Sequence, residues 1–261
     1  MVKGVSVKFV SYSDTIPRLL KLLKFDVELQ EHTKVVIKPF LRDSASPHTS
    51  PALVEQVLRY CLDHKSEGMQ IFIAEGSDGE NTMELFEKVG YKKLAERYHV
   101  GLVDLNEAEL EETLSTSFAK FESISYPKLL KESFVVSLAP LAEDSELGMI
   151  GALSNMIGAF PTKKYKGFFS KKKEKIRKWP MAYSINDIIA CKMPDFSIID
   201  ASDKGSLFAG KPLDMDKQAV KLLGKESKSV SYIHLVEEAG QKANQPADNF
   251  VEEVADKEAK E

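Results

Sequence analysis

The chain has 261 residues, of which 43% are hydrophobic and 29% are charged, and its formal net charge is −4. This composition excludes disorder over most of the length, and the length allows one large domain or two small ones. A net charge this close to balance identifies no class of partner, so only the distribution of charge along the chain is informative.

Two hydrophobic patterns alternate along the chain. Short apolar or alternating runs predict strands over residues 5–9, 35–37, 71–74, 102–105, 134–138 and 196–199. Apolar residues at helical spacing predict helices over residues 16–23, 52–64, 82–89, 148–160, 185–191, 215–223 and 231–238. Because short apolar strands separated by helices form parallel crossover units, we expect an α/β fold with a mostly parallel sheet and helices on both faces.

Three segments depart from this alternation. Residues 116–126 alternate in polarity and predict an antiparallel edge strand or hairpin. Residues 163–178 form a basic insertion within a single α/β domain that we expect over residues 1–240. Residues 241–261 are polar and acidic, which is typical of a solvated tail.

The cysteine and histidine content argues against an iron–sulfur cluster and against a structural zinc site. Cys61 and Cys191 lie in apolar stretches without a Cys-x-x-Cys neighbour, so we expect two buried, reduced thiols. Two cysteines cannot supply the four thiolates of an iron–sulfur cluster, and the five histidines lack metal-ligand spacing. The N-terminus lacks the apolar core of a signal peptide and no run approaches the length of a membrane span, so we expect a cytoplasmic protein.

Polar side chains follow several of the predicted strands, and ligands bind outside the carboxyl ends of parallel strands. The ligand-binding candidates of this kind are Lys38, Ser77, Asp78, Asp104 and Asp200. Their carboxylates would hold a divalent cation, whereas Lys38 would bind a phosphorylated or carboxylated small molecule. The alternative is that Asp, Ser and Gly occur there because they form turns.

The basic insertion is the most unusual feature, with nine lysines and arginines and one acid over residues 163–178. Tyr165, Phe168, Phe169 and Trp179 lie among or beside these charges. The pattern suits a small anionic ligand, a nucleic acid or an anionic membrane surface, and a solvated loop whose aromatic residues pack back onto the domain is the alternative. The predicted contact residues are Lys163, Lys164, Lys171, Lys172, Lys173 and Arg177.

Glycines recur in the predicted helix over residues 148–160, at Gly148, Gly151 and Gly158. Glycine inside a helix costs roughly 1 kcal/mol relative to alanine, so we expect either close packing of this helix on the sheet or an anion cradled at its start. The spacing matches neither a dinucleotide-binding fingerprint nor a Walker loop, and the chain has no nucleophile elbow.

Several motifs in order resemble the Domain of Unknown Function 362 family, whose prokaryotic members are often fused to ferredoxin-like iron–sulfur modules. They are VVIKP at 35–39, TSP at 49–51, AEG at 74–76, residues 82–90, LVDLN at 102–106, GALSN at 151–155, PDFSIID at 194–200 and PLDMDKQAVKLLG at 212–224. The resemblance implies an α/β fold, adds Asn155 to the ligand-binding candidates and brings no settled reaction.

The chain also departs from the family pattern. Phe40 replaces an asparagine, Ser154 replaces a lysine, and residues 140–145 lack the two lysines and the histidine that the family carries there. From this comparison we expect that the strand which the family places before residue 212 is lacking, and we expect no fused iron–sulfur module. We therefore expect a binder of a small anion or divalent cation, a non-catalytic interaction protein that lost the family site, or a nucleic-acid-binding protein; the sequence does not decide whether the chain is an enzyme or what its oligomeric state is.

Overall fold

The computed structural model describes residues 4–243, and these are built around a seven-stranded sheet with the order β1-β11-β10-β7-β2-β3-β4. The predicted parallel strands are present: they pair in register and run in one direction. They are β2 (Lys34–Pro39), β3 (Gln70–Glu75), β4 (Gly101–Asp104), β7 (Phe134–Pro140) and β10 (Phe196–Ala201). Two further strands, β1 (Val5–Lys8) and β11 (Ser206–Gly210), extend one edge in antiparallel fashion.

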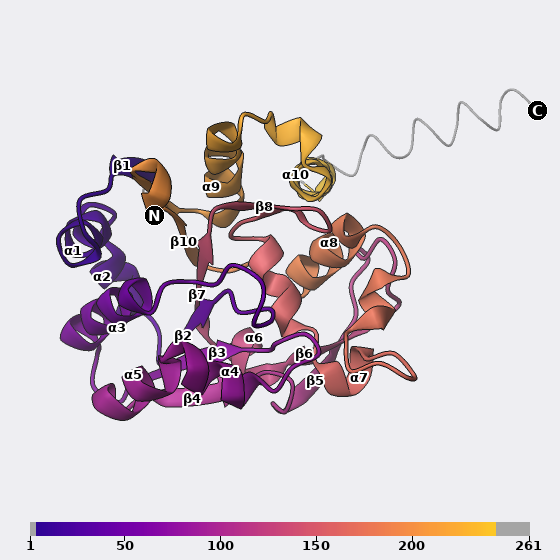
Figure 1. The fold of residues 1–261 in the computed structure, drawn as a ribbon, viewed down its shortest axis with the longest axis horizontal. Coiled ribbons are helices and arrows are strands. Elements are labelled where there is room, and N and C mark those ends of the chain that lie inside the picture. The colour runs from indigo at the N-terminus through magenta and orange to yellow at the C-terminus, as the bar shows by residue number, and fades with distance from the viewer. Residues whose placement is uncertain (1–3, 244–261) are drawn as a thin grey trace, which may run out of the picture.

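Helices cover both faces of this sheet (Figure 1). One face carries α1 (Tyr12–Leu22), α2 (Phe25–Leu29), α3 (Pro51–His64), α4 (Thr82–Val89) and α5 (Tyr91–Tyr98). The other carries α6 (Lys128–Glu132), α8 (Met181–Cys191), α9 (Pro212–Ala219) and α10 (Ser231–Ala243). Successive residues of β2 alternate between the two cores: Val35 and Ile37 pack on one side and Val36 on the other. The mostly parallel α/β fold is therefore confirmed.

The helix predicted over residues 148–160 is wrong. The segment forms a short strand β9 (Gly148–Ile150), a turn and a 3₁₀ helix η1 (Ser154–Ala159), and β9 pairs with β8 (Ala142–Asp144). Gly148 has a φ of +79°, which a continuous helix does not allow. Within the turn, the backbone N–H groups of Ala152 and Leu153 donate to the carboxylate of Asp216 on α9 at 2.7 and 3.0 Å. A tertiary contact thus replaces the helical hydrogen bonds.

The hairpin expected near residues 116–126 is present with other bounds. Its strands are β5 (Leu110–Thr113) and β6 (Ile124–Pro127), which pair with each other and not with the edge of the main sheet. The strand thought to be lacking before residue 212 is also present, as β11. Most of the predicted acidic tail, over residues 244–261, lies outside the described residues. No helix among those described combines the length and hydrophobicity needed to cross a bilayer.

Candidate functional site

Lys38 at the end of β2 is fully buried, with 0% of the residue exposed. Its Nζ donates hydrogen bonds to Glu75 Oε2 at 2.8 Å, to the backbone oxygen of Asn155 at 2.7 Å and to Asn155 Oδ1 at 2.9 Å. An ammonium group has three protons, so all of its donors are used. Two predicted ligand-binding residues, Lys38 and Asn155, are therefore brought together, but they bind each other and Glu75.

Asn155 also closes the crevice between β2 and β7. The strand order reverses at this point, which is where open α/β sheets usually bind ligands. The Asn155 amide donates to the backbone oxygen of Lys38 and to Ser137 Oγ, both at 2.9 Å. The side chain of Asn155, itself a predicted ligand-binding residue, therefore bridges the ends of β2 and β7.

In this ion pair, burial and the attraction between the two charges shift the pKa of each group in opposite directions. Burial is the largest influence on the pKa of Lys38 and lowers it, while Glu75 raises it. Burial likewise raises the pKa of Glu75, and Lys38 lowers it. Removing either partner would leave the other charge buried and uncompensated, so the pair stabilises the ends of β2 and β3 only while both side chains are present.

A second lysine enters the same region from the basic segment, residues 163–178. Lys173 is only 2% exposed, and its Nζ donates to the backbone oxygens of Gly76 at 2.7 Å and Gly158 at 3.3 Å. Burial lowers the pKa of Lys173 to about 8, against attraction from Glu75 and Asp78. Lys173 was predicted to contact an external anion, but it lies inside the protein because backbone carbonyls receive its ammonium.

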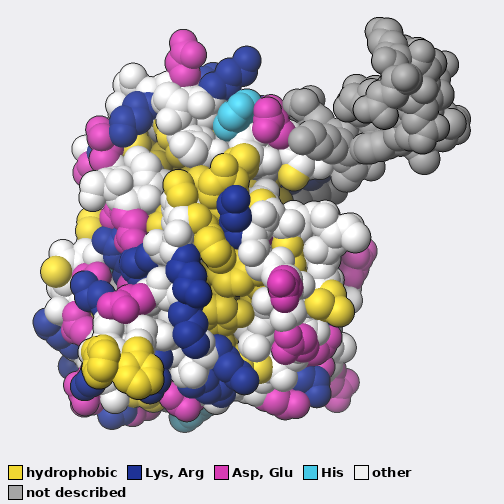
Figure 2. All heavy atoms as spheres, turned by 90° about the vertical axis from the view of Figure 1, so that its right-hand side faces the viewer, with side chains coloured by type: hydrophobic (Ala, Val, Ile, Leu, Met, Phe, Trp, Pro, Cys, Tyr) yellow, Lys and Arg dark blue, Asp and Glu magenta, His cyan; other side chains and the backbone are white. Residues whose placement is uncertain are grey.

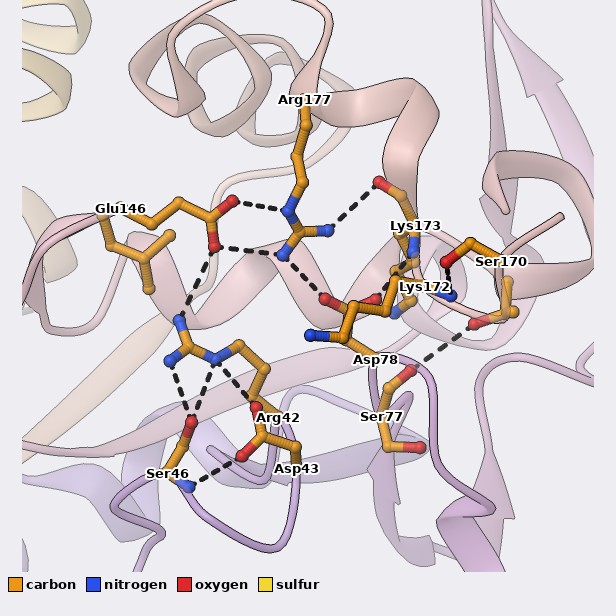
Figure 3. A network of polar contacts seen from close by, with 12 residues as sticks. Arg42, Asp43, Ser46, Ser77, Asp78, Glu146, Ser170, Lys172, Lys173 and Arg177 are labelled. Atoms are coloured by element: carbon orange, nitrogen blue, oxygen red, sulfur yellow. Dashed lines mark hydrogen bonds and ion pairs between the residues drawn. The ribbon is translucent and has the colours of Figure 1, made fainter. Parts of the chain in front are cut away.

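Asp78 fastens the basic segment to the loop after β3 (Figure 3). Its Oδ1 accepts the Lys173 backbone N–H at 2.7 Å, and its Oδ2 accepts Arg177 Nη2 at 2.7 Å. Arg177 pairs in addition with Glu146, which lies 3.9 Å from Arg42 Nη1. Asp78 and Arg177, predicted to bind ligands, are used in this internal network.

An open groove of about 920 Å³ lies beside this network, at the carboxyl ends of β3 and β4. We call it the strand-end groove. It is lined by residues 79–85, which lead into the first turn of α4, by Lys88 in the last turn of α4, by residues at and after the end of β4, and by parts of the basic segment. Among these are Asp104, Lys166 and Lys171. Burial raises the pKa of Asp104, and this is the largest influence on that carboxyl group.

The wall of the groove is built by Asn106, which follows β4. Its amide donates to the backbone oxygen of Ser77 and to Thr82 Oγ1, at 3.0 and 3.1 Å. Its Oδ1 accepts the backbone N–H of Thr162 at 2.8 Å. Asn106 thereby joins the β3 loop, the start of α4 and α7 (Thr162–Tyr165). Ser77 is buried in this junction, with its Oγ donating to the backbone oxygen of Glu80.

Asp200 is not brought together with the other candidates. It ends β10, which is separated from β3 by β7 and β2. Its Oδ2 accepts the hydroxyl of Tyr12 at 2.6 Å, and its Oδ1 accepts the backbone N–H of Ser202. This carboxylate therefore ties α1 to the end of β10.

The rest of the basic segment faces outward. Lys164, Lys171 and Lys172 are exposed, and Lys163, also exposed, donates to the backbone oxygen of Ala108 at 2.7 Å. Tyr165 is buried and Trp179 lies edge-on against Phe121, so these two aromatic residues do pack back onto the protein. Phe168 and Phe169 do not: they are 93% and 96% exposed.

Two buried carboxylates, Glu75 and Asp216, are not among the ligand-binding candidates given above. Glu75 stands with Ser77 and Asp78 among the polar residues that follow the predicted strand at 71–74, and a carboxylate that ends an apolar strand needs a partner. Asp216 carries little signal, because it lies in an ordinary amphipathic helix. In the structure it is fully buried, and burial raises its pKa to about 7.

The expectation of a divalent cation gains no support from the geometry. Within residues 4–243, no three His, Cys, Asp or Glu side chains are grouped so that they could hold a metal ion. Two of the three acidic candidates are engaged elsewhere, Asp78 with Arg177 and Asp200 with Tyr12.

The chain is similar to known proteins in two respects. A crystal structure of a Thermotoga maritima protein, from the Northeast Structural Genomics Consortium, aligns with a TM-score of 0.48 and 13% identity over 90% of this chain and 60% of that chain. This chain thus spans less than two thirds of that protein, and a search of curated proteins finds no match. The model of the family described as "Domain of unknown function (DUF362)" matches residues 35–220. The chain therefore belongs to this family, as its motifs indicated.

Proposed function

We propose that this protein binds a small anionic metabolite in the strand-end groove. The observation that carries the proposal is the groove itself, about 920 Å³ of open space at the carboxyl ends of β3 and β4 with lysines on its walls. Open parallel sheets bind ligands at this end, and the volume lies in the range of small-molecule sites.

Lys166 and Lys171 take the role that the sequence gave to Lys38. Both are exposed, both line the groove, and both belong to the basic segment that Asp78 fastens beside it. Lys38 has no proton left to donate. A phosphate or carboxylate group of the ligand would therefore lie against Lys166 and Lys171.

The groove is not uniformly basic, and this narrows the ligand class. Glu80, Glu84, Asp104 and Glu107 also line it. Carboxylates accept hydrogen bonds from hydroxyl and amino groups. The lining thus favours a phosphorylated or carboxylated compound that also carries hydroxyl or amino groups, such as a sugar phosphate, over a simple dianion.

Isothermal titration calorimetry of the whole chain at pH 7.5 tests this proposal, with inorganic phosphate, a hexose phosphate and citrate as probes. We expect the hexose phosphate to bind best. The Lys166→Ala/Lys171→Ala variant should weaken its binding about tenfold or more, since about 1.4 kcal/mol corresponds to a factor of ten. Lys221→Ala is the matched control, because Lys221 is exposed on η4 (Val220–Leu223), outside the groove lining.

Two results would contradict the proposal. If none of the three probes binds to the wild-type protein, the alternative of a non-catalytic interaction protein gains support. If Mg²⁺ or Mn²⁺ alone binds and Asp104→Asn abolishes that binding, the site is a cation site instead.

A further inference from the structure

The loop at the centre of the basic segment presents two phenylalanines to solvent. The backbone N–H of Gly167 donates to the Lys172 oxygen at 3.1 Å and closes the loop. Phe168 and Phe169 lie within it, 93% and 96% exposed, with ring centroids 4.6 Å apart and planes at 83°. We call these two residues the aromatic tip. They are the most exposed large hydrophobic residues in the part of the chain that the structure describes.

The base of this loop is fixed on both sides. Before the tip, Tyr165 is buried and its hydroxyl accepts the Ser125 backbone N–H at 3.0 Å. After it, Lys173 is held by Gly76, Gly158 and Asp78, and Ile176 is 1% exposed. With both ends anchored in the interior, the loop projects the aromatic tip outward.

The segment that carries the tip is rich in positive charge. Lys163, Lys164, Lys166, Lys171, Lys172, Lys175 and Lys178 are all exposed, and Glu174 is the one acid of residues 163–178. The whole chain has a formal net charge of −4, so this concentration of lysines is local. The face that carries the segment shows Lys and Arg side chains beside exposed hydrophobic ones (Figure 2).

We propose that the aromatic tip and its lysines dock this protein onto an anionic lipid bilayer. The interface of a bilayer takes up protruding apolar rings, while its phosphate headgroups attract the lysines around them. Binding strength grows with the apolar area that is buried in the interface and with the attraction to anionic lipids, so the two contributions act together. The proposal does not rest on the strand-end groove: Lys166 and Lys171 line that groove, but neither phenylalanine does.

The ring geometry favours a membrane over a nucleic acid. Single-stranded nucleic acids stack successive bases on aromatic faces that lie roughly parallel to the bases. The planes of Phe168 and Phe169 meet at 83°, so the two faces do not suit consecutive stacked bases. An insertion into lipid sets no such requirement.

Vesicle co-sedimentation of the full chain tests the proposal, with 100% phosphatidylcholine vesicles compared with vesicles in which about a third of the lipid is phosphatidylserine. We expect binding to the anionic vesicles only, weakened by salt. Phe168→Ser/Phe169→Ser should lower the partition coefficient about tenfold or more, and Lys164→Gln/Lys172→Gln should lower it and flatten its salt dependence. Leu22→Ser/Val27→Ser removes two exposed apolar side chains from α1 and α2 and should bind like the wild type.

Three results would overturn the proposal. The first is that the wild-type protein stays in the supernatant with anionic vesicles, and the second is that the phenylalanine double variant binds as the wild type does. The third is that a single-stranded oligonucleotide displaces the protein from vesicles and binds it more tightly at equal salt. Because none of these variants alters Lys166 or Lys171, binding of a hexose phosphate can be measured on each of them. Failure of membrane docking is thereby distinguished from failure of the groove proposal.

Discussion

Lys38 Nζ lies 2.8 Å from Glu75 Oε2, inside the protein and at the ends of two neighbouring parallel strands. The side chains are 0% and 3% exposed. This pair, completed by Asn155, fills the crevice where the strand order reverses. The open groove lies farther along the same edge, at the ends of β3 and β4.

Removing one partner of this pair should be costly. Lys38→Met leaves Glu75 buried without its counter-charge, and we expect the free energy of unfolding to fall by about 3–5 kcal/mol. The Lys38→Met/Glu75→Gln double variant should lose less than the sum of the two single variants. Urea denaturation of all four proteins gives the coupling, and additive losses would show that the two side chains do not stabilise each other.

Lys173 should make stability depend on pH in the alkaline range. Its pKa is lowered from 10.5 to about 8 in the folded protein because burial disfavours the ammonium. Between these values the unfolded chain binds the proton and the folded protein does not, so stability contributed by this group rises with pH over that window. Relative to Lys173→Met, the wild type should gain up to about 3 kcal/mol between pH 7.5 and 10.

The measurement is the difference between the two free energies of unfolding at each pH. Taking the difference removes the titration of tyrosines and other groups that both proteins share. A constant difference across the window would mean that the Lys173 ammonium is no harder to form inside the protein than in the unfolded chain.

Asp78→Asn should loosen the basic segment. The carboxylate accepts the Lys173 N–H and pairs with Arg177 at 2.7 Å each, and the amide cannot pair with the guanidinium in the same way. We expect a loss of about 1–3 kcal/mol and faster hydrogen exchange over residues 167–178. Asp63→Asn, an exposed position on α3, is the control. Unchanged exchange in Asp78→Asn would show that other contacts hold the segment.

Gly158→Ala should disturb the buried pair directly. A Cβ on Gly158 would lie 1.8 Å from Glu75 Oε1 and 2.9 Å from Lys38 Nζ. We expect a loss of about 3 kcal/mol or more, since overpacking of a filled interior forces side chains and backbone to move. At Gly240 in α10 nothing lies within 4 Å of such a Cβ, so Gly240→Ala should leave stability unchanged or raise it by about 0.5–1 kcal/mol. Thermal or urea denaturation compares the two, and equal effects would contradict the crowding at Gly158.

The sequence determined the parallel sheet. The runs at Val35, Phe134 and Phe196 are apolar because strands covered by helices on both faces bury nearly every side chain. The runs at Ile71 and Leu102 lie toward one edge of the sheet and are less completely buried, but they are still apolar enough to be recognised as strands. Local signals also located two helix ends. Proline marks the start of the helix that begins at Pro51, and glycine marks the end of the helix before Gly90, whose φ of +103° suits glycine.

Only the tertiary structure decided residues 148–160 and the candidate site. Apolar content predicted a helix there, but the Asp216 carboxylate, about 60 residues away in sequence, receives the N–H groups that a helix would use internally. The sequence predicted that Lys38, Asp78 and Lys173 contact a ligand, yet whether each charge meets a ligand or another part of the chain depends on contacts between residues 37 to 117 positions apart. The local sequence shows that a charged residue at the end of an apolar strand will need a partner once it is buried. Which partner it contacts is determined only when the chain is folded.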